Sequence, residues 1–285
     1  MTRVVIAGAA GRMGQALIRC GSRMDDVTIT GAVEHAEHAM LGKDSGVVAG
    51  IDENGVAISS DLDGALQNAD AVIDFTFHEA APLNAAACAA AGVVYVLGTT
   101  GLSDDESAAV HSAAESTPVV WAPNMSLGVN LLFSLAKKAA SILDFEYDVE
   151  IVEGHHRYKK DAPSGTAIGL GEAVASGRNQ NYRDVVVHGR EGFTGEREPG
   201  SIGMHALRAG DIVGDHTVYF VTEGERVELT HRASSRDAFA GGALRAAVWG
   251  HGRDAGMYDM HDVHGPKQRP AGHRQQRHHG WRHDE

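Results

Sequence analysis

The feature that most constrains the fold is an alternation of short apolar runs with helical patterns over the first 125 residues. The apolar runs, most of them rich in Val and Ile, lie at residues 3–7, 27–33, 71–75, 93–97 and 119–121. Helical patterns separate several of them, at residues 13–22, at residues 79–91 and in a polar stretch that Ser103 could cap. Near-continuous apolar strands separated by helices are typical of a parallel sheet that is covered on both faces. The pattern therefore predicts an α/β fold with a doubly wound parallel sheet.

The pattern changes after residue 123. A long amphipathic helix is predicted over residues 127–143, and we expect its apolar stripe, with Leu131, Leu135 and Ile142, to face a core. A strand at 149–153 and a helix that begins near Ser164 or Gly165 come next. Strand-like runs then follow one another at residues 185–187, 202–207, 217–221 and 227–230. Successive strands without helices favour an open mixed or antiparallel sheet, so we predict a second, α+β domain.

Composition excludes several classes of protein. With 43% apolar and 22% charged residues, the 285-residue chain is ordinary for a globular protein. A formal charge of −13 argues against nucleic acid as a partner, because phosphate binding needs a basic surface. Cys20 and Cys88 cannot form a disulfide framework, and we find neither a leader segment nor a membrane span. We therefore expect a cytoplasmic protein that does not contact a membrane.

A glycine-rich turn follows the first predicted strand and opens the first helix. Its sequence is Gly8-Ala9-Ala10-Gly11-Arg12-Met13-Gly14, a G-x-x-G-x-x-G variant of the dinucleotide fingerprint. Glycines let the backbone approach a pyrophosphate, which then lies against free N–H groups at the start of the helix. Glu34 ends the second strand, where a carboxylate would accept hydrogen bonds from an adenosine ribose. These residues favour a Rossmann-like nucleotide site over the alternative, a plain tight turn beside a solvated glutamate.

Two further loops follow predicted strands. Gly98-Thr99-Thr100-Gly101 comes after the strand at 93–97, and Ala122-Pro123-Asn124-Met125 after the strand at 119–121. A cofactor lies at the carboxyl ends of parallel strands in folds of this class. Both loops are therefore candidate cofactor contacts, although the first could be only a turn and the second only a hinge.

The strongest concentration of chemical groups lies between a predicted strand and a predicted helix. It reads Glu153-Gly154-His155-His156-Arg157-Tyr158-Lys159-Lys160-Asp161-Ala162-Pro163-Ser164-Gly165-Thr166. Free N–H groups and hydroxyls at the start of the helix suit a carboxylate, and the cations suit a small dianion. His or Lys could donate a proton. Adjacent histidines could also be ordinary loop residues or bind metal, but no Cys and no paired histidine motif accompanies them, so we predict no metal.

These patterns divide the chain into three predicted parts. Residues 1–125 and 236–265 are expected to form the dinucleotide-binding domain, which includes a final helix at 237–249. Residues 126–235 are expected to form a domain for substrate binding and oligomerisation. The remaining segment, 266–285, is basic, holds four histidines and has almost no apolar residues, so we expect it to be disordered.

The chain resembles the 4-hydroxy-tetrahydrodipicolinate reductase (dihydrodipicolinate reductase) family over about residues 2–264. The segment from His155 to Ala167 is similar to the signature of that family and is highly specific. The glycine turn and Gly98–Gly101 are also similar, in order, as are 190–197, 208–214 and 230–236.

The resemblance implies an oxidoreductase of diaminopimelate and lysine biosynthesis. It would transfer a hydride from NADH or NADPH to dehydrated 4-hydroxy-tetrahydrodipicolinate, a small dicarboxylate. The positions that match the family's catalytic residues are His155 and Lys159, and those that match its substrate ligands are His156, Gly165 and Thr166. The cofactor would contact Gly8, Ala9, Ala10, Gly11, Arg12, Met13, Glu34, Gly98, Thr99, Thr100, Ala122, Pro123, Asn124 and Met125. Family members are typically homotetramers.

Two departures from the family bear on the cofactor. His35 stands where some members have an arginine that meets the 2′-phosphate of NADPH, and Phe77-His78 stands where an arginine is often present. Fewer fixed cations at the adenosine end weaken NADPH more than NADH. We therefore expect NADH to be used at least as well.

Three other interpretations are open to the residues alone. A related imino-acid or aspartate dehydrogenase would share the nucleotide half, and the intact segment from His155 to Thr166 disfavours it. A non-catalytic NAD-sensing protein would have no need of both His155 and Lys159. A metal-binding protein would need a single site, whereas the 17 histidines are scattered or lie near the C-terminus. Arg236 could support the substrate or make a structural ion pair.

Overall fold

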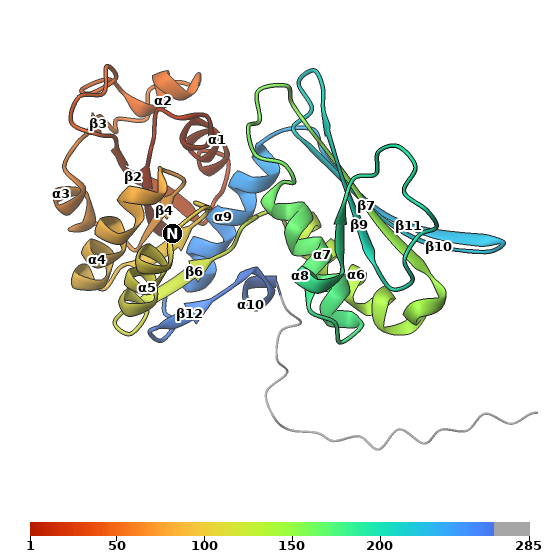
Figure 1. Ribbon diagram of the computed structural model, residues 1–285. Coiled ribbons are helices and arrows are strands. Elements are labelled where there is room, and N and C mark those ends of the chain that lie inside the picture. Colours follow the sequence, from red (N-terminus) through yellow and green to blue (C-terminus); the bar gives the residue numbers. More distant parts are fainter. Residues whose placement is uncertain (265–285) are drawn as a thin grey trace, which may run out of the picture.

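The computed structural model describes residues 1–264, so the prediction for residues 266–285 lies outside the described residues. Two sheets lie side by side in these residues, and helix α9 (Asp237–Gly250) lies between them (Figure 1). Within residues 1–264, none of the helices has both the length and the apolar character needed to cross a lipid bilayer.

The first sheet has seven strands in the order β12-β6-β5-β4-β1-β2-β3, and every neighbouring pair is parallel. The strands are β1 (Thr2–Ala7), β2 (Val27–Val33), β3 (Ile58–Ser59), β4 (Ala71–Asp74), β5 (Val94–Leu97), β6 (Pro118–Trp121) and β12 (Gly256–Tyr258). The helices around it are α1 (Arg12–Gly21), α2 (Ser45–Ala49), α3 (Leu62–Leu66), α4 (Ala81–Ala91), α5 (Asp104–Ala113) and the 3₁₀ turn η1 (His78–Ala80).

Both faces of this sheet are buried. Val4 and Ile6 pack with α1 and α9 on one face, whereas Val5 and Ala7 pack with α4 and α5 on the other. A strand with cores on both faces has no polar face, which explains its near-continuous apolar sequence. The prediction of a doubly wound, Rossmann-like parallel sheet is confirmed.

The second sheet has five strands in the order β11-β10-β7-β9-β8. Its strands are β7 (Asp148–His155), β8 (Val186–His188), β9 (Ile202–Arg208), β10 (Gly214–Thr222) and β11 (Glu225–Ala233). β7 runs antiparallel to β10 and parallel to β9, so the sheet is open and mixed as predicted. Helices α6 (Leu127–Leu143) and α7 (Gly165–Gly177) pack on it. The 3₁₀ turn η2 (Asp144–Glu146) follows α6 in the chain, α8 (Tyr182–Val185) contacts α7, and α10 (Met260–His264) contacts α6.

The predicted buried stripe of α6 is wrong, although the bounds of the helix are right. Leu131, Leu135 and Ile142 are exposed, whereas Val129, Leu132, Ala136 and Ala140 are buried. Small residues let helices approach closely, and α7 contributes Gly177 to this contact, beside Ala140. The helix is apolar on more than one face, so its sequence period does not select the face that packs.

The junction between the two sheets depends on a close contact of α9. A Cβ atom at Gly242 would lie 1.7 Å from the carbonyl oxygen of Met125, so only glycine fits there. A Cβ atom at the neighbouring Gly241 would have no heavy atom within 4 Å. α9 therefore approaches the end of the Ala122–Met125 loop through one glycine only.

We predict that Gly242→Ala and Gly241→Ala have opposite effects on stability. Overpacking against a backbone oxygen should lower the free energy of unfolding by about 3 kcal/mol in Gly242→Ala. Gly241→Ala should raise it by up to about 1 kcal/mol, because alanine favours a helix more than glycine. Urea denaturation of both variants measures this, and equal effects would contradict the close contact.

Candidate active site

The glycine turn connects β1 to α1 at the carboxyl edge of the first sheet. A Cβ atom at Gly14 would lie 2.1 Å from the carbonyl oxygen of Gly8, so the helix can start this close to the turn only with glycine. Gly11 is the N-cap of α1 and supplies no side-chain hydrogen bond. The first N–H groups of the helix therefore remain available to an anion.

Glu34 lies at the end of β2 and contacts this turn. Its Oε1 accepts a hydrogen bond of 2.9 Å from the backbone N–H of Ala10. The bond orients the carboxylate beside the turn and uses one oxygen, which leaves the other for a ligand hydroxyl. The geometry is that of a ribose-binding carboxylate next to a pyrophosphate turn.

A cavity of about 710 Å³ lies over these residues. Of the predicted cofactor residues, it is lined by Gly8, Gly11, Arg12, Met13 and Glu34. Ala9 is fully buried beneath the turn, and Ala10 contributes the N–H that Glu34 accepts. The cavity is also lined by His35 and His38 after Glu34, and by residues of two other segments, Thr76 and Phe77 after β4 and Arg236 before α9.

The loop at Gly98–Thr100 does not line the cavity but supports its wall. Thr99 Oγ1 donates to the carbonyl oxygen of Thr76 at 3.0 Å. The buried Asp74 accepts hydrogen bonds from the N–H and hydroxyl of Thr76, at 2.7 and 2.6 Å. Thr100 is exposed. This loop therefore lies at the carboxyl edge of the sheet, one residue layer from the cavity.

The loop at Ala122–Met125 leads from β6 to α6, and a hydrogen bond links it to the start of α7. Asn124 Nδ2 donates to Thr166 Oγ1 at 3.0 Å, and the carbonyl oxygen of Asn124 accepts from Asn130 Nδ2 at 2.8 Å. Ala122 and Met125 are buried, and Pro123 is exposed. A predicted cofactor residue and a predicted substrate residue are thus in direct contact.

The segment predicted to bind the substrate joins β7 to α7. His155 ends β7, and Ser164 is the N-cap of α7, where its hydroxyl accepts the N–H of Ala167. Gly165 and Thr166 form the first turn of this helix. A Cβ atom at Gly165 would meet nothing within 4 Å, so the space above this helix start is open.

A buried carboxylate, Glu153, holds this segment together. Its side chain has no exposure to solvent. Its oxygens accept from His155 Nδ1 at 2.6 Å, from both terminal nitrogens of Arg208 at 2.7 and 2.8 Å, and from Ser164 N–H at 3.0 Å. Burial alone would raise the pKa of Glu153, but the hydrogen bonds and charges of His155 and Arg208 outweigh burial and lower it to about 2. The carboxylate is therefore ionised.

His216, on β10, is a second buried group in this cluster. Its Nε2 lies 3.1 Å from Ser164 Oγ, and its ring meets that of His155 edge to face, with centroids 5.2 Å apart. Burial, reinforced by the charge of His155, lowers the pKa of His216 to about 3. A neutral His216 therefore fills the space behind His155 without competing for its proton.

Cations from both sheets converge on the space between them. Burial lowers the pKa of His156, and the charges of Arg12 and Arg236 lower it further. Arg12 belongs to α1 and Arg236 precedes α9, and both line the cavity over the glycine turn. Neither arginine has a carboxylate within ion-pair distance in the described part of the chain, and Lys159 pairs with the exposed Asp161 at 2.8 Å.

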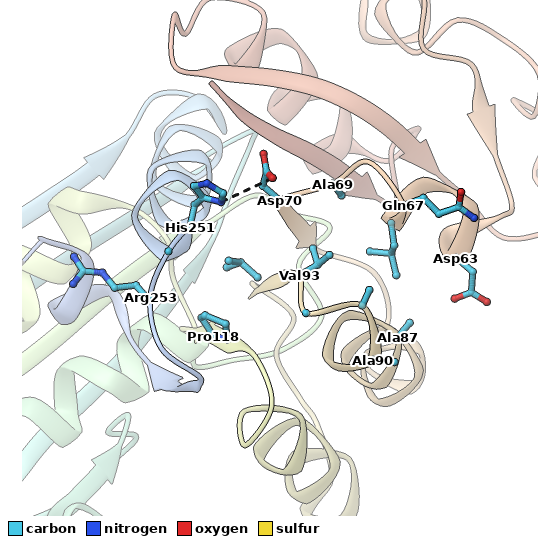
Figure 2. A pocket seen from close by; sticks show the side chains of 15 residues that line it. Asp63, Gln67, Ala69, Asp70, Ala87, Ala90, Val93, Pro118, His251 and Arg253 are labelled. Carbon is cyan, nitrogen blue, oxygen red and sulfur yellow. Dashed lines mark ion pairs between the residues drawn. The ribbon is translucent and has the colours of Figure 1, made fainter.

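A second cavity of about 710 Å³ lies at the opposite edge of the first sheet (Figure 2). Its lining includes Asp70, Val93, Val94 and Pro118, which lie at the amino ends of β4, β5 and β6. Asp70 is already paired with Arg3 at 2.7 Å, and His251 approaches it at 4.0 Å. Ligands of such sheets bind at the carboxyl ends of the strands, so this cavity is not the candidate site.

One group of possible metal ligands occurs in residues 1–264. Atoms of Glu34, His35 and His38 lie within 4.8 Å of one another. Two of these residues already accept backbone hydrogen bonds, Glu34 from Ala10 and His38 Nδ1 from Met40 at 3.2 Å. The absence of a metal therefore stays a prediction.

The structure joins the predicted substrate and cofactor residues directly at the bond of Asn124 to Thr166, and it adds Glu153, Arg208 and His216 to the site. Glu153 lies two residues before His155, which places both on the same face of a strand, and that spacing was a usable signal. Arg208 lies opposite His155 in the register of β9, and His216 opposite Glu153 in that of β10. Such pairings join residues that are more than 50 positions apart, and no local pattern shows them.

Models for the two halves of one protein family match residues 2–125 and 128–263 of this chain. Residues 2–125 match the one described as dihydrodipicolinate reductase, N-terminus, and residues 128–263 the one described as dihydrodipicolinate reductase, C-terminus. A 4-hydroxy-tetrahydrodipicolinate reductase of Anaeromyxobacter dehalogenans (strain 2CP-C) is 52% identical over 265 residues, 93% of this chain and 98% of that protein. A protein of the same name from Syntrophotalea carbinolica is 51% identical over 267 residues, 94% of this chain and 100% of that protein.

The fold is also that of a solved relative. A dihydrodipicolinate reductase from Paenisporosarcina sp. TG-14, with dipicolinate bound, superposes with a TM-score of 0.71 at 24% identity, over 91% of this chain and 97% of that one. Sequence matches over both halves carry the assignment, and the structural likeness agrees with it. The chain belongs to the dihydrodipicolinate reductase family.

Proposed function

We propose that this protein is an NAD(P)H-dependent 4-hydroxy-tetrahydrodipicolinate reductase of diaminopimelate and lysine biosynthesis. The observation that carries the proposal is the approach of two sites across the junction. Thr166, at the end of the cationic loop, accepts a hydrogen bond of 3.0 Å from Asn124, in the loop that follows β6 at the carboxyl edge of the first sheet. A reductase of this kind needs a nucleotide and a dicarboxylate side by side.

The residues fit a nicotinamide dinucleotide. The N–H groups of Arg12 and Met13, at the start of α1, have no acceptor among residues 1–264, and the second oxygen of Glu34 is available to a ribose hydroxyl. Gly98–Thr100 and Ala122–Met125 lie along the same carboxyl edge toward the second sheet. When bound, the nucleotide supplies the hydride.

The substrate would be held as a dianion. Gly165 and Thr166 offer N–H groups at the start of α7, Arg12 and Arg236 supply positive charge, and His156 would contribute a hydrogen bond. The solved dihydrodipicolinate reductase from Paenisporosarcina sp. TG-14 holds dipicolinate, a dicarboxylate, and this supports a dicarboxylate substrate here. His155 or Lys159 would deliver the proton that completes the addition of a hydride and a proton to the dehydrated substrate.

The adenosine end of the cavity favours NADH. The side chains beside Glu34 are His35 and His38, and the Glu34 carboxylate itself repels a 2′-phosphate. His78 pairs with Glu106 at 2.9 Å, which leaves its charge compensated. We therefore propose that NADH is used at least as well as NADPH.

The division of labour between the two sheets is also a proposal. Residues 1–125 and 236–265 would bind the nucleotide, because α9 packs on α1 and β12 pairs with β6. Residues 126–235 would bind the substrate and assemble a homotetramer. Most of the exposed large apolar side chains belong to this second part, among them Leu131, Leu135 and Leu207, as expected of a surface that meets other copies.

A coupled assay tests the proposed activity. The purified chain should oxidise NADH only when freshly made 4-hydroxy-tetrahydrodipicolinate is supplied, and the absorbance of the reduced nucleotide reports the rate. Oxaloacetate with ammonium is the control for an aspartate dehydrogenase. Oxidation with that mixture, or none with either substrate from folded protein, would contradict the proposal.

His155→Ala and Lys159→Ala test the proton donors. Each should lower kcat by about a hundredfold or more, the usual contribution of a positioned acid. The dissociation constant of NADH, measured by fluorescence titration, should change little because neither side chain lines the nucleotide cavity. An equal loss of NADH affinity in both variants would assign them to the cofactor site instead.

His35→Arg tests the basis of cofactor choice. A fixed guanidinium at this position should raise the ratio of kcat/KM for NADPH over NADH by about tenfold, as expected for one charge-assisted phosphate contact. Glu37→Arg, in the same loop but outside the cavity lining, is the matched control. A wild-type chain that binds NADPH tenfold tighter than NADH would overturn the proposal.

A further inference from the structure

Glu153 is hydrogen-bonded to two parts of the proposed substrate site, His155 at the end of β7 and Ser164 at the start of α7. Four N–H groups fill the acceptor positions of its two oxygens: Oε2 accepts from His155 and Arg208, and Oε1 from Arg208 and Ser164. His155 is a proposed proton donor, and Ser164 caps the helix whose first turn would hold the substrate carboxylate. One carboxylate therefore sets the position of both groups.

The bond to His155 also selects a tautomer. A carboxylate that is ionised accepts only, so Nδ1 of His155 must carry a hydrogen at this 2.6 Å contact. Nε2 of the same ring has no hydrogen-bond partner among residues 1–264. It is therefore the nitrogen that can exchange a proton with a substrate, and the ring side toward Glu153 stays protonated throughout.

Arg208 stabilises the buried carboxylate of Glu153 through charge and hydrogen bonds. Its two terminal nitrogens neutralise Glu153, and one of them also donates to the carbonyl oxygen of Asp161 at 2.6 Å. The side chain of Asp161 pairs with Lys159. Arg208 thus connects the carboxylate to the loop that carries the second proposed proton donor.

We propose that Glu153, held by Arg208, is a positioning residue that keeps Nδ1 of His155 protonated and directs Nε2 to the substrate. The proposal rests on the proposed function of His155. When Nε2 gives its proton to the reduced substrate, the neutral ring left behind retains Nδ1–H on Glu153, and no second proton moves. The groups that face His155 are Glu153 on its own strand, Arg208 on β9 and His216 on β10.

Glu153→Gln tests this positioning role. The side-chain amide of glutamine has an oxygen that accepts and an NH₂ group that donates. The NH₂ group would meet two N–H donors, of Arg208 and Ser164, on one side, but only one, of Arg208, on the side of His155. We therefore expect the NH₂ group to face His155, whose Nδ1 must then accept a hydrogen bond. We expect kcat to fall by about a hundredfold while the KM of NADH stays within about twofold. The pH profile should respond as well. A proton donor is active below its midpoint and loses activity as pH rises. Loss of the anion removes a negative neighbour of the proton donor and should therefore move the alkaline limb of kcat to lower pH.

The tautomer can be read without turnover. Nitrogen-15 NMR of the His155 side chain should show the Nδ1–H tautomer in the wild-type chain and the Nε2–H tautomer in Glu153→Gln. This signal separates the two proposals. A wild-type chain with the Nδ1–H tautomer but no reductase activity would sink only the function, whereas an unchanged tautomer and pH profile in the variant would sink the positioning role.

Two further variants guard against a purely structural effect. Glu150→Gln is the matched control, because Glu150 lies on the same strand and is also bonded to arginines and a histidine, Arg190, Arg197 and His205. It should leave the tautomer and the pH profile unchanged. The double variant Glu153→Gln with Arg208→Gln removes the buried carboxylate together with the partly exposed guanidinium that pairs with it. If it folds stably but recovers the wild-type profile, the positioning role is overturned; we expect it to recover stability only.

Discussion

The proposed substrate site depends on one buried charge. A carboxylate removed from water is costly unless donors surround it, and breaking such a cluster leaves an uncompensated ion. Glu153 meets this demand with donors from β7, β9 and the first residue before α7. The strand, its neighbour and the helix start must therefore occupy one fixed arrangement. The two ends of the loop from His155 to Ser164 are therefore held in place, because a shift of either end would leave the Glu153 charge without a donor.

Carboxylates also accept hydrogen bonds at the proposed nucleotide site, but the one that faces the cavity is less buried than Glu153. Glu34 is only partly buried, and its one hydrogen bond to the glycine turn leaves capacity for a ligand. Asp74 is fully buried and accepts from Thr76, Asn84 and Tyr95, so it supports the cavity wall rather than a ligand. Carboxylates with filled acceptor positions build the frame, and the one with a free oxygen faces the cavity.

Local chemistry accounts for what could be predicted from the sequence. The expected helix at 127–143 and strand at 27–33 match α6 and β2 to the residue, and Ser103 forms a capping box with Glu106. Short or weakly patterned elements were not predicted, such as the two-residue β3 and the three-residue β12, because their existence depends on a neighbouring strand. The buried face of α6 was wrong for a related reason: packing against α7 selects small residues, and periodicity treats leucine and alanine alike.

The candidate site could likewise be predicted only where its residues are contiguous in the sequence. The residues of the glycine turn and of the His155–Thr166 segment are contiguous, so sequence alone groups them. Their mutual approach depends on contacts between segments far apart, the hydrogen bond of Asn124 to Thr166 and the seat of α9 against Met125. Because both contacts end on the Ala122–Met125 loop, that loop determines the separation of the two half-sites. A displacement of the start of α7 relative to the first sheet would therefore break the hydrogen bond between Asn124 and Thr166.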